Sequence, residues 1–313
     1  MSENLTKNQL EQIEIHLQEE GFQNISFLPY FEVSEAFKHF YLKYLSDKKE
    51  ANLIYLRNTE AKFDIRNIYP QTKSIVAASY FYLNSKTLEA LKAHKYKIAR
   101  YAWGRDYHNV LKKKMAKICQ KFSEGRAVVD STPLPEKYTA RRANLGFIGK
   151  NGLLIHEHYG SFFLLVFYLM EKELPVDYKQ NIREEEISPA RDIEKYCQNC
   201  VKCVKACPTA AIDIDGCIEA EKCVSYRTIE EREELKLVKS KKHRYIFGCD
   251  ICQVVCPYNK KPLFNEDDDF YPTKISMALA EGDFSGLSDD SLNGSPLKRR
   301  KIEGLKKNIS MIT

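Results

Sequence analysis

The sequence predicts an α/β (α+β) lobe followed by a ferredoxin-like domain, and two observations support this fold class. In the first half of the chain, segments with helical periodicity alternate with short β-branched and aromatic segments, as in mixed α/β folds. Nine of the ten cysteines lie between residues 197 and 257, and seven of these form two runs that each end in Cys-Pro. A chain of 313 residues with 43% hydrophobic composition can bury cores in more than one lobe.

Helices and strands are expected to alternate near the N-terminus. Apolar residues recur at helical spacing over residues 5–20, and Gly21 stands where such a helix would end. Residues 24–29 are expected to form a short strand and residues 34–45 a second helix. Residues 74–83 are β-branched and aromatic, which is typical of a central strand.

A further helix and two further strands are expected before residue 171. The helix has its apolar face over residues 110–122 and would hold Cys119 in the core as a small apolar residue. Residues 127–129 predict a strand that ends at Asp130, where a carboxylate is either a candidate acid or the start of a turn. The apolar run 162–170 is too short to span a bilayer as a helix and fits a buried strand.

A glycine-rich segment lies between these two expected strands, and the chain after residue 176 is more polar. Glycines recur every third residue from Gly146 to Gly152; this spacing fits neither a dinucleotide-binding loop nor a P-loop, but it can bring backbone amides close to a bulky ligand. We expect a linker over residues 177–194, a charged helix over residues 228–238 and a loop-rich tail from residue 266.

The two cysteine runs have the spacing of iron-sulfur ligands. In the bacterial ferredoxin pattern three closely spaced thiolates bind one cluster, and the fourth, next to proline, binds the other. Two [4Fe-4S] clusters with exchanged ligands are therefore expected. The first set of ligands is Cys197, Cys200, Cys203 and Cys256, and the second includes Cys207, Cys249 and Cys252.

Two clusters need an eighth thiolate, and by spacing alone either Cys217 or Cys223 could supply it. Structural zinc and disulfides are the alternatives, but neither explains two runs that end in C-x3-C-P. The N-terminus lacks the basic and then apolar pattern of a signal peptide, so a cytoplasmic protein without a membrane segment is expected. The net charge of +6 permits a polyanionic partner.

Motifs outside the cysteines resemble the epoxyqueuosine reductase family, enzymes with cobalamin and iron-sulfur clusters that finish queuosine synthesis in tRNA. The resemblance implies that cob(I)alamin, fed by two [4Fe-4S] clusters, reduces epoxyqueuosine in the anticodon loop. It also implies no histidine beneath cobalt, and Leu111 indeed breaks the D-x-H-x-x-G motif that begins at Asp106. The matching segments, in the family's order, are residues 101–108, 129–131, 142–151, 159–161, 223–226, 248–253 and 297–300.

The resemblance implies roles for individual residues. Asp130 matches the proton donor, and Cys223 matches the isolated cluster ligand that precedes a Ser-Tyr pair. Lys137 stands where an arginine is more usual, so it keeps the charge but loses the planar fork. The expected tRNA contacts are Lys137, Arg227, Lys298, Arg299 and Arg300. The expected cobalamin contacts are Arg57, Asn151, Gly152, Leu153, Leu154, Ser225, Cys249 and Asp250.

The implied organisation is a cobalamin-binding lobe over residues 1–180, a two-cluster domain over 181–265 and a basic tRNA-contacting segment over 266–313. The expected partners are a tRNA anticodon stem-loop carrying epoxyqueuosine and an unidentified electron donor, and the chain is expected to be a monomer. Asp130 can donate a proton near neutral pH only if burial raises its pKa. The rival functions are a cobalamin reductase acting on small halogenated molecules and a two-cluster electron-transfer protein.

Overall fold

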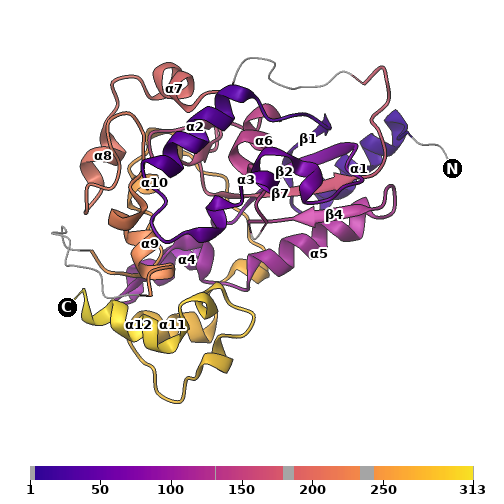
Figure 1. The fold of residues 1–313 in the computed structure, drawn as a ribbon. Coiled ribbons are helices and arrows are strands. Elements are labelled where there is room, and N and C mark those ends of the chain that lie inside the picture. Colours follow the sequence, from indigo (N-terminus) through magenta and orange to yellow (C-terminus); the bar gives the residue numbers. More distant parts are fainter. Residues whose placement is uncertain (1–3, 131, 179–186, 233–242, 313) are drawn as a thin grey trace.

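A four-stranded antiparallel sheet forms the centre of the first lobe (Figure 1). The computed structural model describes residues 4–130, 132–178, 187–232 and 243–312. The two central strands pair along their whole lengths, from Ser74 opposite Met170 to Phe81 opposite Phe163. Because each neighbouring pair is antiparallel, the lobe is α+β and not a parallel α/β sheet. In sheet order the strands are β1 (Gln23–Pro29), β2 (Ser74–Phe81), β7 (Phe163–Met170) and β4 (Gly125–Val128).

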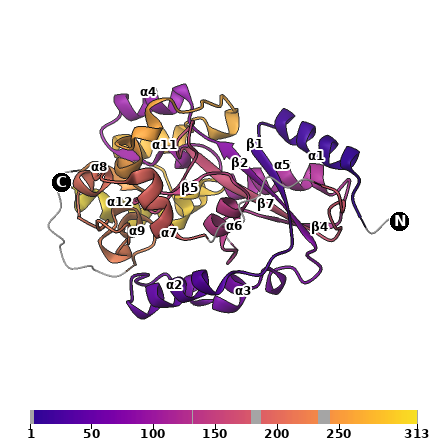
Figure 2. The same cartoon turned by 90° about the horizontal axis from the view of Figure 1, so that it is seen from above.

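Both faces of the sheet are covered, which explains the continuous apolar runs of its central strands. All eight residues of β2 are buried, and they alternate between two cores, with Tyr80 in one and Phe81 in the other. Helices α1 (Lys7–Glu19) and α5 (Tyr107–Cys119) pack on the Tyr80 side. Helices α3 (Thr59–Phe63) and α6 (Glu136–Arg142) contribute to the opposite core (Figure 2).

Several local predictions are confirmed. The strands expected over residues 74–83 and 162–170 are β2 and β7, and the strand expected over 24–29 is β1. Cys119 is fully buried in the core against Met115. Helix α2 (Glu35–Ser46) also forms where expected, although none of its residues is buried.

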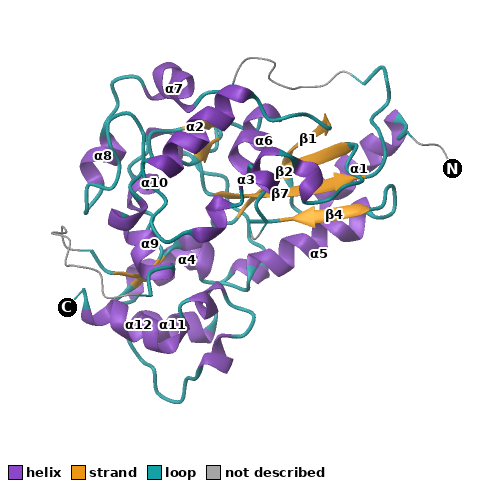
Figure 3. Cartoon of the chain, in the orientation of Figure 1, coloured by secondary structure: helices purple, strands orange, loops and turns teal. Residues whose placement is uncertain are grey.

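The second part of the molecule, which we call the cysteine-rich half, runs from residue 187 to about residue 265. It consists of short helices and loops (Figure 3). A parallel pair of short strands joins this half to the first lobe. The helices are α7 (Pro189–Asp192), α8 (Lys202–Ala206), α9 (Val224–Ile229) and α10 (Ile251–Val254). The short strands are the parallel pair β3 (Lys97–Ile98) and β8 (Tyr245–Phe247) and the hairpin β5 (Phe147–Ile148) and β6 (Leu154–Ile155).

The tail from residue 266 is more regular than the sequence suggested. Helices α11 (Lys274–Glu281) and α12 (Lys301–Ser310) pack with α4 (Ser85–Ala93) and the fully buried Trp103 in a third core. The expectation of a loop-rich tail is therefore wrong. A capping box starts α11, with Ser276 in the place of the more usual glutamate or glutamine opposite Thr273.

Three sequence predictions fall partly outside the described residues. The linker expected over 177–194 and the proposed boundary at residue 180 involve residues 179–186, which lie outside them. The helix expected over 228–238 is described only to residue 232, and α9 ends at Ile229. The division of the chain at residues 180 and 265 stays a prediction. Over the described residues, no helix combines the length and apolarity needed to cross a membrane.

A buried ion pair ties the first lobe to the cysteine-rich half. The side chains of Arg141 on α6 and Asp192 on α7 are 6% and 2% exposed, and Asp192 also accepts a hydrogen bond from the Ile148 amide at 2.9 Å. Asp192→Ala leaves a buried guanidinium without its counter-charge, so we expect the free energy of unfolding to fall by about 3 to 5 kcal/mol. Chemical denaturation measures this loss, and the exposed neighbour Glu194→Ala is the control. Equal small effects in both variants would contradict the assigned role.

Candidate active site and cluster ligands

Two adjacent cavities separate the cysteines into two groups of four. The smaller cavity, of about 240 Å³, is lined by Cys197, Cys200, Cys203 and Cys256. The larger, of about 400 Å³, is lined by Cys207, Cys223, Cys249 and Cys252. Asn151 lines both cavities. This partition has the exchanged pattern expected from the sequence, in which the cysteine before each proline joins the other run.

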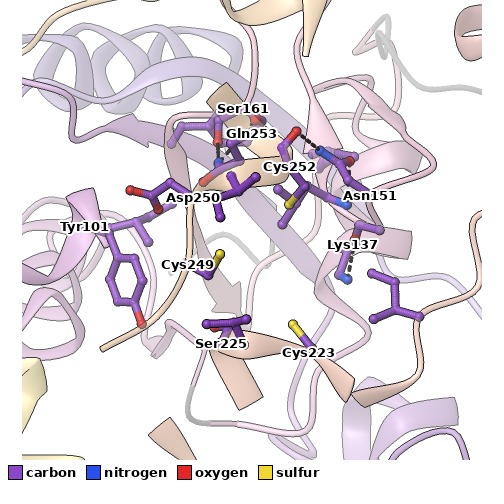
Figure 4. A pocket seen from close by; sticks show the side chains of 18 of the residues that line it. Tyr101, Lys137, Asn151, Ser161, Cys223, Ser225, Cys249, Asp250, Cys252 and Gln253 are labelled. Atoms are coloured by element: carbon purple, nitrogen blue, oxygen red, sulfur yellow. Dashed lines mark hydrogen bonds between the residues drawn. The ribbon is translucent and has the colours of Figure 1, made fainter. Parts of the chain in front are cut away.

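The structure distinguishes the two candidates for the eighth thiolate. Cys223 begins α9 and lies on the wall of the larger cavity, and Figure 4 shows it with Cys249 and Cys252. Cys217 lines neither cavity; its amide donates to Asp213 Oδ1 at 2.7 Å within a small turn. The geometry therefore favours Cys223, as the resemblance implied.

Most of the residues expected to contact cobalamin line the larger cavity. Its walls include Asn151, Gly152, Leu153, Leu154, Ser225, Cys249 and Asp250. Gly152 has a φ of +70°, and a side chain there would collide with Ile218. In contrast, side chains at Gly146 and Gly149 would collide with Ile155, so these two glycines serve the close packing of β5 against β6.

Two of the expected contacts are engaged elsewhere. Asp250 lines the cavity, but it accepts hydrogen bonds from the backbone amide and the Nη1 atom of Arg100, at 2.9 and 2.8 Å. Arg57 is not among the residues that line either cavity, and its guanidinium donates to Glu50 at 3.0 Å. The structure thus does not bring Arg57 into the cavity.

Asp130 projects into the larger cavity from the end of β4. Its φ of +50° is unusual for a residue other than glycine. Tyr107 Oη donates to Asp130 Oδ2 at 2.5 Å, and His108 Nε2 lies 3.3 Å from the same oxygen. The other ring nitrogen of His108 is 2.7 Å from Asp106 Oδ1. Asp130 thus stands at the end of a hydrogen-bonded chain of three ionisable side chains.

These contacts decide where the protons lie. Burial favours neutral Asp130, but its hydrogen bonds with His108 and Tyr107 outweigh burial and hold its pKa below the usual value. Burial likewise opposes a charge on His108, yet its hydrogen bonds with Asp106 and Asp130 raise its pKa to about 9. Glu136, which accepts a hydrogen bond from the Asp130 amide, has a pKa raised to about 8 by burial and by the charge of Asp130.

The condition for proton donation by Asp130 itself, a pKa raised by burial, is not met by the residues around it here, and its role as proton donor stays a prediction. The side chain of Asp130 is 61% exposed, because it points into the cavity, and a cationic neighbour holds it ionised. At neutral pH the protons of this group lie on His108 and Glu136. Sequence reasoning missed both residues as partners of Asp130, although the segment 101–108 was already notable for its resemblance.

The expected tRNA contacts divide into accessible and buried residues. Lys137 is exposed at the cavity and donates to the Gly152 carbonyl at 2.6 Å. Lys298 and Arg299 are exposed, and Arg299 pairs with Glu230. Arg227 is half-buried on α9.

Arg300 does not fit a surface role. It is 4% exposed, and it donates to the Glu231 carbonyl and to Asn308 Oδ1. These bonds hold α12 against the end of α9, so the expectation of a tRNA contact by Arg300 is corrected to a structural role.

Comparison with known families finds two matches within the chain. Residues 62–131 match the family described as epoxyqueuosine reductase QueG, DUF1730. Residues 196–259 match the family described as 4Fe-4S double cluster binding domain. The second match covers both cysteine runs and supports two clusters over zinc or disulfides.

Curated proteins and solved structures give similar results. The epoxyqueuosine reductase of Leadbetterella byssophila is 34% identical over 283 residues, which cover 86% of this chain and 87% of the relative. That of Cyclobacterium marinum is 34% identical over 281 residues, covering 86% of each chain. The fold is similar to that of the Streptococcus thermophilus enzyme, with a TM-score of 0.74, 24% identity, and coverage of 98% of this chain and 81% of the other. An epoxyqueuosine reductase with an epoxyqueuosine-modified tRNA-Tyr stem loop gives a TM-score of 0.77 at 21% identity, covering 97% and 80%.

Proposed function

This chain belongs to the epoxyqueuosine reductase family and is an oxidoreductase, and from that premise we propose that it reduces epoxyqueuosine to queuosine in the anticodon loop of tRNA. The observation that carries the proposal is one cavity with two kinds of chemistry. Cysteines of the second set form one part of its wall, and Asp130 with its proton-bearing neighbours forms another. Electron supply and proton supply therefore meet at one place.

The residues present fit the groups that the family implies. Each cavity offers four cysteine thiols, the donor set of a [4Fe-4S] cluster. The larger cavity has an apolar wall at Leu153, Leu154 and Ile218, the kind of surface that a flat ring system can pack against, so it suits cobalamin. When bound, cobalamin reduced through the two clusters supplies the strongly reducing cobalt that the removal of an epoxide oxygen requires.

The side chains around Asp130 handle the protons of the reaction. The oxygen that leaves the epoxide needs a proton. Asp130 lines the cavity, and its Oδ2 atom lies between two donors, Tyr107 and His108. Because Asp130 is held ionised, we propose that His108 passes its proton from Nε2 to Oδ2, and that Asp130 delivers it. Asp106 keeps the ring of His108 oriented through Nδ1. Tyr107 fixes the position of the carboxylate.

The direct test is the conversion of the substrate. Protein reconstituted with iron, sulfide and cobalamin is incubated with a strong reductant and tRNA that carries epoxyqueuosine, and the nucleosides are analysed by mass spectrometry. The expected product has lost the mass of one oxygen atom, and omission of cobalamin should abolish it. An unchanged nucleoside from fully loaded protein would refute the proposed reaction.

The pH dependence of turnover should depend on His108. Below a pH of about 9 His108 carries the proton that replenishes Asp130, and above it the ring is neutral, so turnover should fall as pH rises through about 9. Because the pKa of His108 is higher in the folded chain than its unfolded value of about 6.5, protonation of His108 stabilises the fold. This stabilisation is complete below pH about 6.5 and is lost as the pH rises through about 9. In His108→Gln, turnover should fall about tenfold or more and this alkaline limb should disappear. The exposed His158→Gln is the control, and an unaltered profile in His108→Gln would exclude the relay.

Binding of the RNA should depend on salt. Lys137, Lys298 and Arg299 are the accessible cations among the expected contacts, and phosphate contacts by three such groups predict about a tenfold loss of stem-loop affinity between about 50 and 200 mM salt. Arg299→Ala should make this dependence shallower, whereas Lys274→Ala, an exposed control on α11, should not. Fluorescence anisotropy of a labelled anticodon stem-loop measures both. A flat salt response would remove these residues from the RNA surface.

The same proposal covers location, assembly and domains. We place the protein in the cytoplasm, where its tRNA substrate is made, and treat it as a monomer. The predicted three parts then have separate tasks, with residues 1–180 enclosing cobalamin, residues 181–265 holding the clusters and residues 266–313 adding RNA contacts. Size-exclusion chromatography with light scattering tests the monomer.

A further inference from the structure

Exposed lysines flank, along the chain, the cysteines that line the smaller cavity. Each lies within five residues of a cysteine of the first set along the chain, and Lys202 also lines the cavity itself. Among the described residues of these segments Glu194 is the exposed carboxylate, and Glu157 lies near Tyr258, so positive charge predominates over this part of the chain. We call these lysines the lysine rim; its members are Lys195, Lys202, Lys205, Lys260 and Lys261.

An exposed apolar side chain lies beside the lysine rim. Val254 on α10 is 50% exposed, although it stands between Cys252 and Cys256 in the sequence. Helix α10 packs against α8, which carries Lys202 and Lys205 one turn apart. A small apolar patch surrounded by charged residues is typical of a transient protein interface. Electron-transfer complexes have some of the smallest buried interface areas.

The two cavities have different access requirements. The larger cavity contains Asp130 and must admit the substrate, so a protein bound over its mouth would compete with the RNA. The smaller cavity contains none of the residues around Asp130. It meets the larger one at Asn151, whose Nδ2 donates to the Cys252 carbonyl at 3.4 Å. Electrons that enter at the first set can therefore reach the second set without blocking the substrate.

We infer that the lysine rim docks an acidic one-electron carrier protein, of the flavodoxin or ferredoxin class, which delivers electrons to the cluster held by the first set of cysteines. The inference rests on the proposed function and adds the partner that feeds it. In each encounter the carrier is oxidised by one electron and the cluster is reduced by one. Two encounters supply the two electrons that, with two protons, convert the epoxide to an alkene and water.

RNA is the competing occupant of a basic surface, and the geometry favours the carrier. Figure 1 shows α8 at the outer edge of the molecule, on the opposite side from the β-sheet. The accessible RNA candidates Lys298 and Arg299 instead follow α11 at the C-terminal end, where Arg299 pairs with Glu230. The lysine rim thus flanks the first set of cysteines along the chain, and none of its members lines the cavity that contains Asp130.

The experiment compares a protein reductant with a small one. Lys202→Glu/Lys205→Glu protein carrying both clusters is mixed anaerobically with reduced flavodoxin, and the loss of visible cluster absorbance is followed by stopped flow. At low salt we expect the second-order rate to fall about tenfold, and the wild-type rate to fall as salt rises. Reduction by dithionite should stay within about twofold of wild type. The yield of carbodiimide cross-links between the variant and flavodoxin should fall as well. This yield does not depend on turnover.

Further variants separate the possible outcomes. Lys113→Glu/Lys121→Glu makes the same charge change on and just after α5 and should leave the flavodoxin rate unchanged. If the α8 variant fails to hold iron, Lys260→Glu/Lys261→Glu tests the other side of the lysine rim. A flavodoxin rate unchanged in both rim variants would overturn the inference. So would a loss of stem-loop affinity with an unchanged flavodoxin rate, which would make the rim an RNA surface. If the proposed function is wrong, protein that has been reduced with dithionite will also fail to reduce the epoxide.

Discussion

Asp130→Asn should lower single-turnover reduction of epoxyqueuosine by a factor on the order of 10² or more, while both clusters and cobalamin remain bound. The amide oxygen of asparagine can still accept from Tyr107 and His108, so the geometry of the cavity is kept. What is lost is the group that takes a proton from His108 and releases it to the leaving oxygen. Iron, cobalamin and product are measured on the same sample.

Asp177→Asn is a suitable control for that experiment, because Asp177 is an exposed partner of Lys7 at the surface. It should leave turnover unchanged. A near-normal rate in Asp130→Asn would remove Asp130 from the proton pathway. The next candidate would then be Glu136, the neighbouring carboxyl group whose pKa burial and the charge of Asp130 raise to about 8.

Cys223→Ala should remove up to half of the iron, because the cluster in the larger cavity would lose one of its four ligands. Cys217→Ala is the matched control, a cysteine six residues earlier that lines neither cavity. Iron and sulfide analysis after anaerobic reconstitution measures the difference. Equal losses in the two variants would reopen the assignment of the eighth ligand.

The cluster ligands could be predicted from the sequence because their chemistry is local. The first run places four thiols and the second run three within about ten residues, and the proline after Cys207 and Cys256 marks the thiol that joins the other group. The structure separates the cysteines in the same way. The eighth ligand is less local, and spacing alone could not distinguish Cys217 from Cys223.

The protonation of Asp130 could not be predicted, because it depends on residues brought together by folding. His108 lies on α5, Asp130 follows β4 and Glu136 begins α6, so their mutual distances are set by the sheet and its helices. Similarly, Arg300 looks like part of an exposed basic run, but the packing of α12 buries it beneath Asn308. Neither periodicity nor charge along the chain carries this information.

The direction of the strands was also beyond the sequence. Alternating helices and strands are compatible with parallel and antiparallel sheets, and the pairing of β2 with β7 joins segments about 90 residues apart. The apolar runs did predict that both strands are buried on both faces. They did not show that β7 would lie between β2 and β4, the arrangement that brings Asp130 to the cavity.

The central claim is that one chain joins two iron-sulfur clusters to cobalamin in the cavity that contains Asp130. The most direct measurement is a titration of cluster-loaded protein with cobalamin, followed by gel filtration and by the visible spectrum of the retained vitamin. The account predicts one cobalamin per chain, retained with both clusters present. Protein that carries both clusters and yet retains no cobalamin would contradict it and leave only an electron carrier.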